Sequence, residues 1–497
     1  MKVNQIKGGV LFSYLTLLVM VLVAFFMTPY MIDRIGKSEY GLYSLLGAFI
    51  GTLGVLDFGL NNTVVRYVAK YRHENDKTNE KYFLGTVFRL YFFISFLVLI
   101  VGLIFYYNLD YLLGNSLTKI ELHDAHTIVK ILIFNLIVLL PGNAFSAISY
   151  GYEKFIFPKA AIMIKYLIRA VLLLILLYYK TSALAIVILD TIMNISLIFA
   201  NIFYVRYVLK IRWQFNYFNK TLLYEIFGYS FWIFLIAITH EFHWKMSQFL
   251  VGMKTNTETI AVMSIGIMLS GFYGALGAAI SSVFLPKATG MVVNNATAKE
   301  LTDEMIRLGR VILIIQLFVL GGFILFGKQF ILLWLGEDYG ESWEVALWIM
   351  CVMTLEFSQS FGSSILEAKK MIRFKSIFYL LSISIGLFIG YLIIDHYSML
   401  GMVKSFTLAM LINTIVIMYY YKLKINIDVF SFIKETFFKS IFLFLIVVLF
   451  FEYVLHLFPI SSWYHLIVQI IIYCFIYVVT FFFFGLRKEE KLFLWNN

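Results

Sequence analysis

Residues 29–72 read PYMIDRIGKSEYGLYSLLGAFIGTLGVLDFGLNNTVVRYVAKYR, and the middle of this stretch is strongly apolar. At about 1.5 Å of rise per residue, a helix over 40–64 is long enough to cross the roughly 30 Å hydrocarbon core of a bilayer. A basic flank follows directly, with Arg66, Lys70 and Arg72. This stretch therefore predicts a membrane-spanning helix that ends on the side of the membrane where basic residues collect.

Similar apolar runs recur along the whole chain, which is 61% hydrophobic and only 14% charged over 497 residues. Soluble proteins are about a quarter charged, so lipid is the expected solvent for most of this chain. We find fourteen such runs, at about 10–32, 40–64, 83–107, 127–150, 160–179, 182–205, 224–250, 258–284, 308–333, 344–366, 376–394, 398–421, 437–457 and 463–485. The predicted fold class is an all-α integral membrane protein with about 14 transmembrane helices.

Lysine and arginine residues orient these helices. The loops on one side of the predicted membrane, together with both chain ends, carry 28 of them, whereas the alternate loops carry 6. Because short cytoplasmic loops are enriched in Lys and Arg, both termini are predicted to be cytoplasmic. The formal net charge of +11 is explained by this topology, so we expect no nucleic-acid partner.

The first apolar run is too long for the core of a signal peptide, and we interpret it as a retained first span. Both cysteines, Cys351 and Cys474, fall inside apolar runs. That placement indicates neither a disulfide framework nor a cysteine metal site.

Small residues in the first spans recur 220 positions later. The four matches pair Gly8, Ser44, Gly51 and Gly54 with Gly228, Ser264, Gly271 and Gly274. The shift equals six helices, which predicts a parallel repeat, a design that transporters use with the substrate site between the repeats. The predicted domains are an N-lobe of six spans, a C-lobe of six spans, and two added spans with a cytoplasmic tail, at 1–210, 211–424 and 425–497 respectively.

The seventh apolar run contains the polar sequence HEFHWK. On a helix, His240, His243 and Trp244 share one side, and Glu241 and Lys245 lie next to them at a spacing that allows an ion pair. Two interpretations stay open: a buried ion pair with satisfied histidines, or the wall of a water-filled cavity. The spacing differs from the H-E-x-x-H zinc motif, so no metal site is predicted.

Other charged residues inside the predicted spans are costly to insert and normally face a partner or water. Lys165 and Arg169 lie one helical turn apart and repel each other, so an anion is expected nearby, either a protein carboxylate such as Asp190 or an anionic substrate. Arg66 and Arg89 lie near cytoplasmic helix ends, where long side chains also reach the interface without a further role.

No glycine-rich phosphate loop, catalytic triad or zinc-ligand spacing is present, which favours a transporter over an enzyme. No cofactor is expected. A coupling ion, H⁺ or Na⁺, would need an acidic residue within the membrane, and the candidates are Asp57, Asp190, Glu241 and Glu356.

The motif residues of the opening stretch resemble a known transporter family. They are Pro29, Ile35-Gly36, the run from Glu39 to Tyr43, the turn from Asp57 to Leu60, and Arg66. The second half has a similar pattern, with Gly252, an alternating eighth span and then Pro286. The chain resembles the bacterial polysaccharide and O-antigen export flippases, the polysaccharide-transport branch of the multidrug/oligosaccharidyl-lipid/polysaccharide (MOP) transporter superfamily. Members often carry an acidic residue shortly before the glycine, where this chain has Ser247 and Gln248.

The resemblance implies two pseudo-symmetric six-helix lobes, as in MATE transporters, plus two C-terminal helices. It also implies translocation of an undecaprenyl-pyrophosphate-linked oligosaccharide, an O-antigen, capsule or exopolysaccharide repeat unit, from the cytoplasmic to the outer leaflet of the bacterial inner membrane by alternating access. The expected partners are this lipid-linked oligosaccharide, membrane lipids, and the glycan polymerase and glycosyltransferases. The expected substrate-binding residues are Arg169, Lys165, Arg66, Arg89, Lys245, His240, His243 and Trp244.

Two other functions stay open. A MATE-type drug/cation antiporter would need an acid-dominated cavity, whereas the spans hold six basic residues against four acidic ones. A non-transporting membrane scaffold for glycan assembly would leave the charges within the membrane paired and would have no open cavity.

Overall fold

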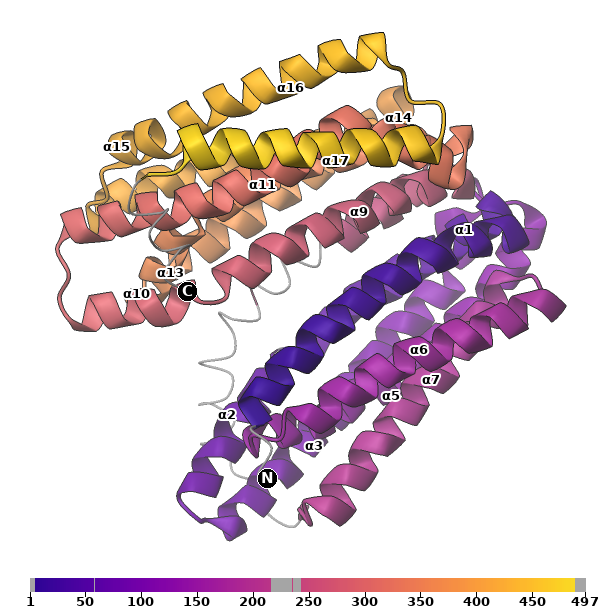
Figure 1. The fold of residues 1–497 in the computed structure, drawn as a ribbon. Helices are drawn as coiled ribbons and strands as arrows, with labels where there is room; N and C mark the ends of the chain where they lie inside the picture. The colour runs from indigo at the N-terminus through magenta and orange to yellow at the C-terminus, as the bar shows by residue number, and fades with distance from the viewer. Residues whose placement is uncertain (1–4, 58, 216–234, 236–242, 488–497) are drawn as a thin grey trace. The chain divides into compact units, whose positions relative to one another are not determined.

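The structure is a computed structural model that describes residues 5–57, 59–215, 235 and 243–487 (Figure 1). In this part of the chain all regular secondary structure is helical. The chain divides into two compact units, Met1–Ala261 and Val262–Asn497. Each unit is described by itself below.

The first unit is a bundle of long apolar helices. In chain order they are α1 (Gln5–Leu53), the 3₁₀ turn η1 (Gly54–Asp57), α2 (Leu60–His73), α3 (Lys77–Tyr107), α4 (Leu109–Leu113), α5 (Lys119–Gly151), α6 (Ile156–Tyr179), α7 (Ala183–Phe203) and the π-helical turn η2 (Tyr204–Val208). The longest packing interfaces join α1 to α6 and α5 to both α3 and α7. Figure 1 shows α1 in indigo running beside α6 in magenta.

The second unit is also a bundle of long helices, and it ends with two further helices. Its elements are α9 (Thr257–Ser281, which begins in the first unit), α10 (Phe284–Val293), α11 (Ala298–Leu335), η3 (Glu337–Tyr339), α12 (Ser342–Ser358), α13 (Ser360–Ala368), α14 (Arg373–Ile425), α15 (Val429–Ile433), η4 (Lys434–Phe438), α16 (Lys439–Leu457), α17 (Trp463–Thr480) and η5 (Phe481–Gly485). The added helices α16 and α17 pack on α11 (Figure 1).

A buried arginine joins the added helices to the rest of the second unit. Arg310 of α11 is only 2% exposed. Its guanidinium donates to the backbone carbonyls of Glu435 in η4, at 2.9 Å, and of Gly485 in η5, at 2.7 Å. Both turns are π-helical, and π-helical turns leave carbonyl groups available to such a donor.

Helix boundaries support the predicted repeat. The helix α2 ends at His73 and α10 ends at Val293, 220 residues later. Each is followed by an asparagine with positive φ, Asn75 at 54° and Asn295 at 53°. Asparagine tolerates this left-handed conformation better than most residues, so both halves make the same corner with the same residue type.

The fold class is confirmed, whereas the count of fourteen spans stays a prediction. Ten described helices are long and apolar enough to cross a membrane, or eleven if the bent pair α12 and α13 forms one span. The helix α14 has 53 residues, about 80 Å, and contains one non-helical residue, Ser398. The 49-residue α1 contains a similar break at Gly36. The break at Gly36 falls between the predicted runs 10–32 and 40–64, and the break at Ser398 falls at the start of the predicted run 398–421.

The seventh predicted run, 224–250, lies mostly outside the described residues. The domain limits and the cytoplasmic location of the termini stay predictions as well.

Candidate functional site

Three helices of the first unit meet at an ion pair. Arg169, near the middle of α6, donates through Nη2 to Asp190 Oδ2 of α7 at 3.0 Å, and its Nε also bonds the other oxygen of that carboxylate. The Tyr43 hydroxyl of α1 donates to the same Oδ2 at 2.8 Å. The Arg169 and Asp190 side chains are only 16% and 21% exposed. The protein carboxylate that the sequence left open as a partner for Arg169 is therefore present.

Lys165 lies one turn away and has a different kind of partner. Its ammonium donates to the amide oxygen of Asn194 at 2.8 Å. The Asn194 amide donates to Asn135 at 3.3 Å, and the Asn135 amide donates to Thr191 at 3.3 Å. This neutral chain of amides orients Lys165 without cancelling its charge. We call Lys165, Arg169, Asp190 and Tyr43 the first cluster; it holds two cations and one carboxylate, and so has an excess of positive charge.

Asp57 lies where the second apolar run is interrupted. The turn η1 ends at Asp57, and Gly59 then takes a left-handed conformation with φ 68° before α2 begins. The Asp57 carboxylate accepts a hydrogen bond from the Asn61 backbone N–H at 3.3 Å and lies beside the Tyr91 hydroxyl. Broken helices of this kind are frequent at transporter sites, because they expose backbone polar groups.

The two other predicted arginines lie on neighbouring helices. Arg66 is exposed on α2, and Arg89 is half-buried on α3. Their assignment as substrate-binding residues stays a prediction.

The polar sequence of the seventh run is only partly described, because His240 and Glu241 lie outside the described residues. His243 is fully buried, and its ring lies 4.3 Å from that of Trp244. The Lys245 ammonium donates to the Gly51 carbonyl at 3.4 Å. A Cβ on Gly51 would lie 2.8 Å from the Lys245 side chain, so glycine provides the space for this contact. The Glu241–Lys245 pair stays a prediction.

A second polar cluster lies within the second unit. The Lys375 ammonium, at the start of α14, donates to the Ser363 hydroxyl of α13 at 2.8 Å. Ser363 is in turn 2.8 Å from the Tyr421 hydroxyl. The carboxylates of Glu356 and Glu367 both act electrostatically on Lys375. We call Glu356, Ser363, Glu367, Lys375 and Tyr421 the second cluster.

Sequence analysis identified Glu356 and missed Lys375. Lys375 follows a short basic turn and is one of the 28 basic residues that predict the topology. Its position directly before the predicted run 376–394 could have suggested that it belongs to the same helix. The bend of 49° between α12 and α13 brings α13 against α14. No proline marks this bend in the sequence, so the sequence does not indicate which neighbour Lys375 meets.

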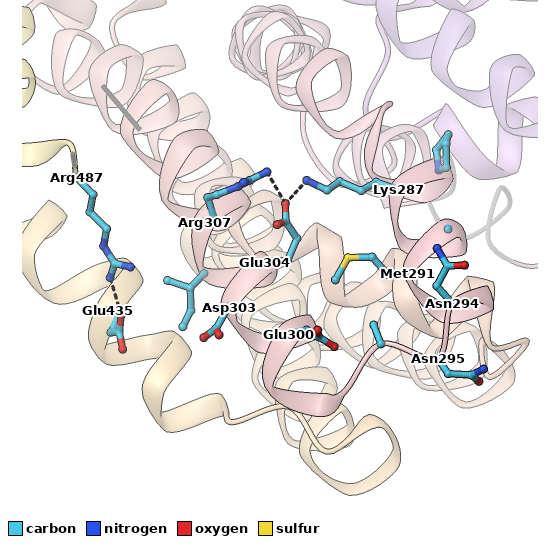
Figure 2. Close-up of a pocket in the computed structure, with 14 residues that line it drawn as sticks. Lys287, Met291, Asn294, Asn295, Glu300, Asp303, Glu304, Arg307, Glu435 and Arg487 are labelled. Carbon is cyan, nitrogen blue, oxygen red and sulfur yellow. Dashed lines mark hydrogen bonds and ion pairs between the residues drawn. The ribbon is translucent and has the colours of Figure 1, made fainter. Parts of the chain in front are cut away.

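A polar pocket of about 1040 Å³ lies where α10, α11, η4 and Arg487 meet (Figure 2). Figure 2 shows Lys287 and Arg307 pointing at the same carboxylate, Glu304, and the Arg307 contact measures 3.0 Å. At another wall Arg487 pairs with Glu435 at 2.5 Å. The sequence did not predict this pocket, because its walls come from segments up to two hundred residues apart.

Comparison with known proteins places the chain in a family. The profile of the polysaccharide biosynthesis protein family matches residues 34–344. The chain belongs to this family. A Shigella flexneri protein named as a candidate O-antigen transporter is 19% identical over 392 residues, which are 78% of this chain and 90% of the relative.

Two solved structures show the same fold. The lipid II flippase MurJ, in an inward closed conformation, aligns with a TM-score of 0.71 and 15% identity over 95% of this chain and 98% of that one. An inward-facing multidrug resistance MATE family transporter of the MOP superfamily aligns with a TM-score of 0.66 and 14% identity over 81% and 94%. The resemblance to the polysaccharide branch of the superfamily and the MATE-like fold class are thus both confirmed.

Proposed function

We propose that this protein is a flippase for a lipid-linked oligosaccharide. It moves an undecaprenyl-pyrophosphate-linked repeat unit from the cytoplasmic to the outer leaflet of the bacterial inner membrane by alternating access, coupled to H⁺ or Na⁺. Membership of the polysaccharide biosynthesis family and the O-antigen relative support this substrate class. The fold shared with MurJ and with a MATE transporter supports a transport mechanism.

The observation that carries the proposal is the positive excess of the first cluster. Lys165 and Arg169 face one carboxylate, Asp190, and the ammonium of Lys165 bonds only to a neutral amide among the contacts described above. A pyrophosphate carries at least two negative charges and strong acceptor oxygens, so it complements this cluster. In the proposed encounter, Lys165 attracts the anion, and the planar guanidinium of Arg169 then exchanges Asp190 for two phosphate oxygens.

The antiporter alternative predicts the opposite charge. An organic cation would be repelled by a cluster with two bases and one acid. The scaffold alternative predicts that the charges only stabilise the fold, so that a charge-free replacement of the cluster would leave glycan export unchanged.

The test is depletion of the protein in a cell that makes a surface glycan, followed by complementation with variants. Depletion should trap lipid-linked glycan in the inner leaflet, where it can be detected by its resistance to a membrane-impermeant glycosidase in intact spheroplasts. Arg169→Ala should reduce export by at least tenfold in membranes that contain normal amounts of protein. Arg169→Lys should restore only part of it, because lysine lacks the bidentate fork.

Lys159→Ala is the matched control. Lys159 is a basic residue of the same helix, and its ammonium lies 5.9 Å from the Tyr150 ring. Its removal should leave export within twofold of the wild type. Full export by an inserted Arg169→Ala, Lys165→Met double variant would refute the binding role of the cluster. Depletion without any glycan trapped in the inner leaflet would refute the flippase.

A further inference from the structure

Three side chains of the second unit form a small polar site on α12 and α14. The Glu344 carboxylate of α12 pairs with the Lys404 ammonium of α14 at 2.8 Å. The indole N–H of Trp348, one turn after Glu344, donates to the same carboxylate at 3.4 Å. The Lys404 ammonium also lies 5.5 Å from the centre of the Trp348 ring. We call Glu344, Trp348 and Lys404 the tryptophan site.

The tryptophan site lies within two predicted spans. Trp348 is six residues after the start of α12 at Ser342, and Lys404 is six residues after the break in α14 at Ser398. Six residues of helix rise about 9 Å, so both side chains begin well inside their helices. The site has no residue in common with the first or the second cluster.

The exposure of these residues indicates that the site faces water and not lipid. The side chains of Glu344 and Lys404 are 36% and 44% exposed, and Trp348 is 42% exposed. An exposed charged pair would be costly in hydrocarbon, so charged side chains within spans normally face water or a partner. Within α12 only Trp348 and Cys351 are exposed, and neither is aliphatic. By contrast, every exposed residue between positions 160 and 175 of α6 is aliphatic, as contact with lipid requires.

An accessible indole beside a carboxylate and an ammonium has the chemistry of a sugar-binding site. The face of an indole carries negative partial charge, so it attracts the C–H groups on the apolar face of a pyranose ring. An ionised carboxylate only accepts hydrogen bonds and an ammonium only donates them, so Glu344 and Lys404 together complement sugar hydroxyls, which do both. The two charges cancel, so the site favours a neutral sugar over a pyrophosphate.

The ion pair also orients the ring. A tryptophan that only anchors a helix at the membrane surface directs its N–H to water or lipid headgroups. The Trp348 N–H instead donates to a carboxylate that is itself held by Lys404. The ring therefore has a defined orientation before any ligand binds, and such preorganisation lowers the entropic cost of binding.

We propose that the tryptophan site binds a neutral sugar residue of the transported glycan. The Trp348 ring stacks on the sugar, Glu344 accepts hydrogen bonds from its hydroxyl groups, and Lys404 donates to them. The proposal rests on the proposed function and deepens it, because it assigns the pyrophosphate to the first cluster and a sugar to the second unit.

The test is saturation-transfer NMR on the purified full-length protein in lipid nanodiscs. The probe is the oligosaccharide repeat unit of the host cell, released from its lipid carrier by mild acid. The wild type should transfer saturation to the ring protons of one sugar residue. Trp348→Leu should reduce this transfer about tenfold, and Trp348→Phe should retain part of it because it keeps an aromatic face. Trp343→Phe is the matched control on the same helix and should leave the transfer unchanged, because the Trp343 N–H donates to the Phe323 carbonyl at 3.0 Å instead.

A second variant keeps the tryptophan and removes its polar neighbours. Glu344→Gln combined with Lys404→Met removes both charges at once, so neither charge is left without its partner. It should fold normally and reduce the transfer at least threefold. Unchanged transfer in this variant or in Trp348→Leu, or no transfer in the wild type, would overturn the sugar site. A tryptophan that serves only as a lipid anchor would give a less stable Trp348→Leu with unchanged transfer.

The probe carries neither pyrophosphate nor lipid, so this measurement is independent of transport. Sugar binding that depends on Trp348, in a protein whose depletion traps no lipid-linked glycan, would refute the flippase and keep the sugar site. Trapped glycan after depletion, without binding that depends on Trp348, would refute the sugar site and keep the flippase.

Discussion

The two units of this protein handle their intramembrane charges in opposite ways. In the first cluster, Arg169 and Asp190 are in direct contact, and the Tyr43 hydroxyl also donates a hydrogen bond to the Asp190 carboxylate. In the second cluster, Lys375 bonds to a serine hydroxyl, and its carboxylates lie on either side of that hydroxyl along the span. The first cluster lies on α1, α6 and α7, and the second lies on α12, α13 and α14.

This difference indicates a division of roles. A direct ion pair stabilises both charges and changes only when a competing charge enters. The carboxylates of the second cluster form no ion pair with a described residue, so an entering anion has none to displace there. We therefore expect the first cluster to respond to an anionic substrate and the second to be little affected by one.

The largest expected effect comes from breaking the direct pair. Asp190→Asn removes the carboxylate that pairs with Arg169, and removing one partner of a buried pair typically destabilises by about 3 kcal/mol. Glu356→Gln removes an unpaired charge and should leave the stability unchanged or slightly higher. Thermal unfolding of the purified variants in one detergent compares them directly.

The double variant Asp190→Asn, Arg169→Met is the control, because it removes both charges of the pair. It should recover most of the lost stability while glycan export stays low. An Asp190→Asn variant as stable as Glu356→Gln would contradict the distinction between the clusters.

The sequence predicted much of this arrangement for a physical reason. Helices in a membrane must satisfy their own backbone groups, so long apolar runs and basic flanks predict spans directly. Repulsion between Lys165 and Arg169 correctly indicated a nearby anion, and Asp190 was among the named candidates. Helical periodicity places residues on one helix, but it says nothing about which face meets which neighbour. For that reason Tyr43, Asn194 and Lys375 were not predicted as partners.

An intermediate effect is expected at a pair of glycines 220 residues apart. A Cβ on Gly142 of α5 would lie 2.6 Å from the side chain of Ile198, and one on Gly362 of α13 would lie 2.7 Å from the ring of Tyr421. Ile198 is an aliphatic side chain with no hydrogen bond to hold it in place, whereas the Tyr421 ring is buried and bonded to Ser363. Overpacking of a rigid site costs about 2 kcal/mol, and alanine recovers up to about 1 kcal/mol through its higher helix propensity.

Gly362→Ala should therefore lower the melting temperature clearly, and Gly142→Ala should change it little. The Gly362→Ala, Tyr421→Phe double variant tests whether the hydrogen bond between Tyr421 and Ser363 makes the ring a rigid neighbour. If the hydrogen bond holds the ring in place, the added loss from alanine should shrink in the phenylalanine background. Equal losses at the two glycines would show that Tyr421 is not a rigid neighbour.

The smallest effects concern two capping boxes, one in each unit. Thr118 and Glu121 cap the start of α5, and Thr297 and Glu300 cap the start of α11, with the same reciprocal hydrogen bonds. Glu121 is only 7% exposed and also accepts hydrogen bonds from the hydroxyls of Ser38 and, at 2.7 Å, Thr257. Glu300 is exposed, and its described contacts are all to Thr297. Glu121→Gln weakens several charge-assisted bonds at once, so it should cost about 1 kcal/mol.

Glu300→Gln keeps an acceptor for the cap in a solvated position, so its melting temperature should stay within experimental error of the wild type. Thermal unfolding of both variants should be compared with that of Thr118→Ala and Thr297→Ala. This comparison separates the contribution of each cap from that of the hydrogen bonds that Glu121 accepts from Ser38 and Thr257. Thr118→Ala and Thr297→Ala should have similar effects, because both remove the same cap hydrogen bond. If Glu121→Gln were as mild as Glu300→Gln, the bonds from Ser38 and Thr257 would contribute nothing beyond the cap itself.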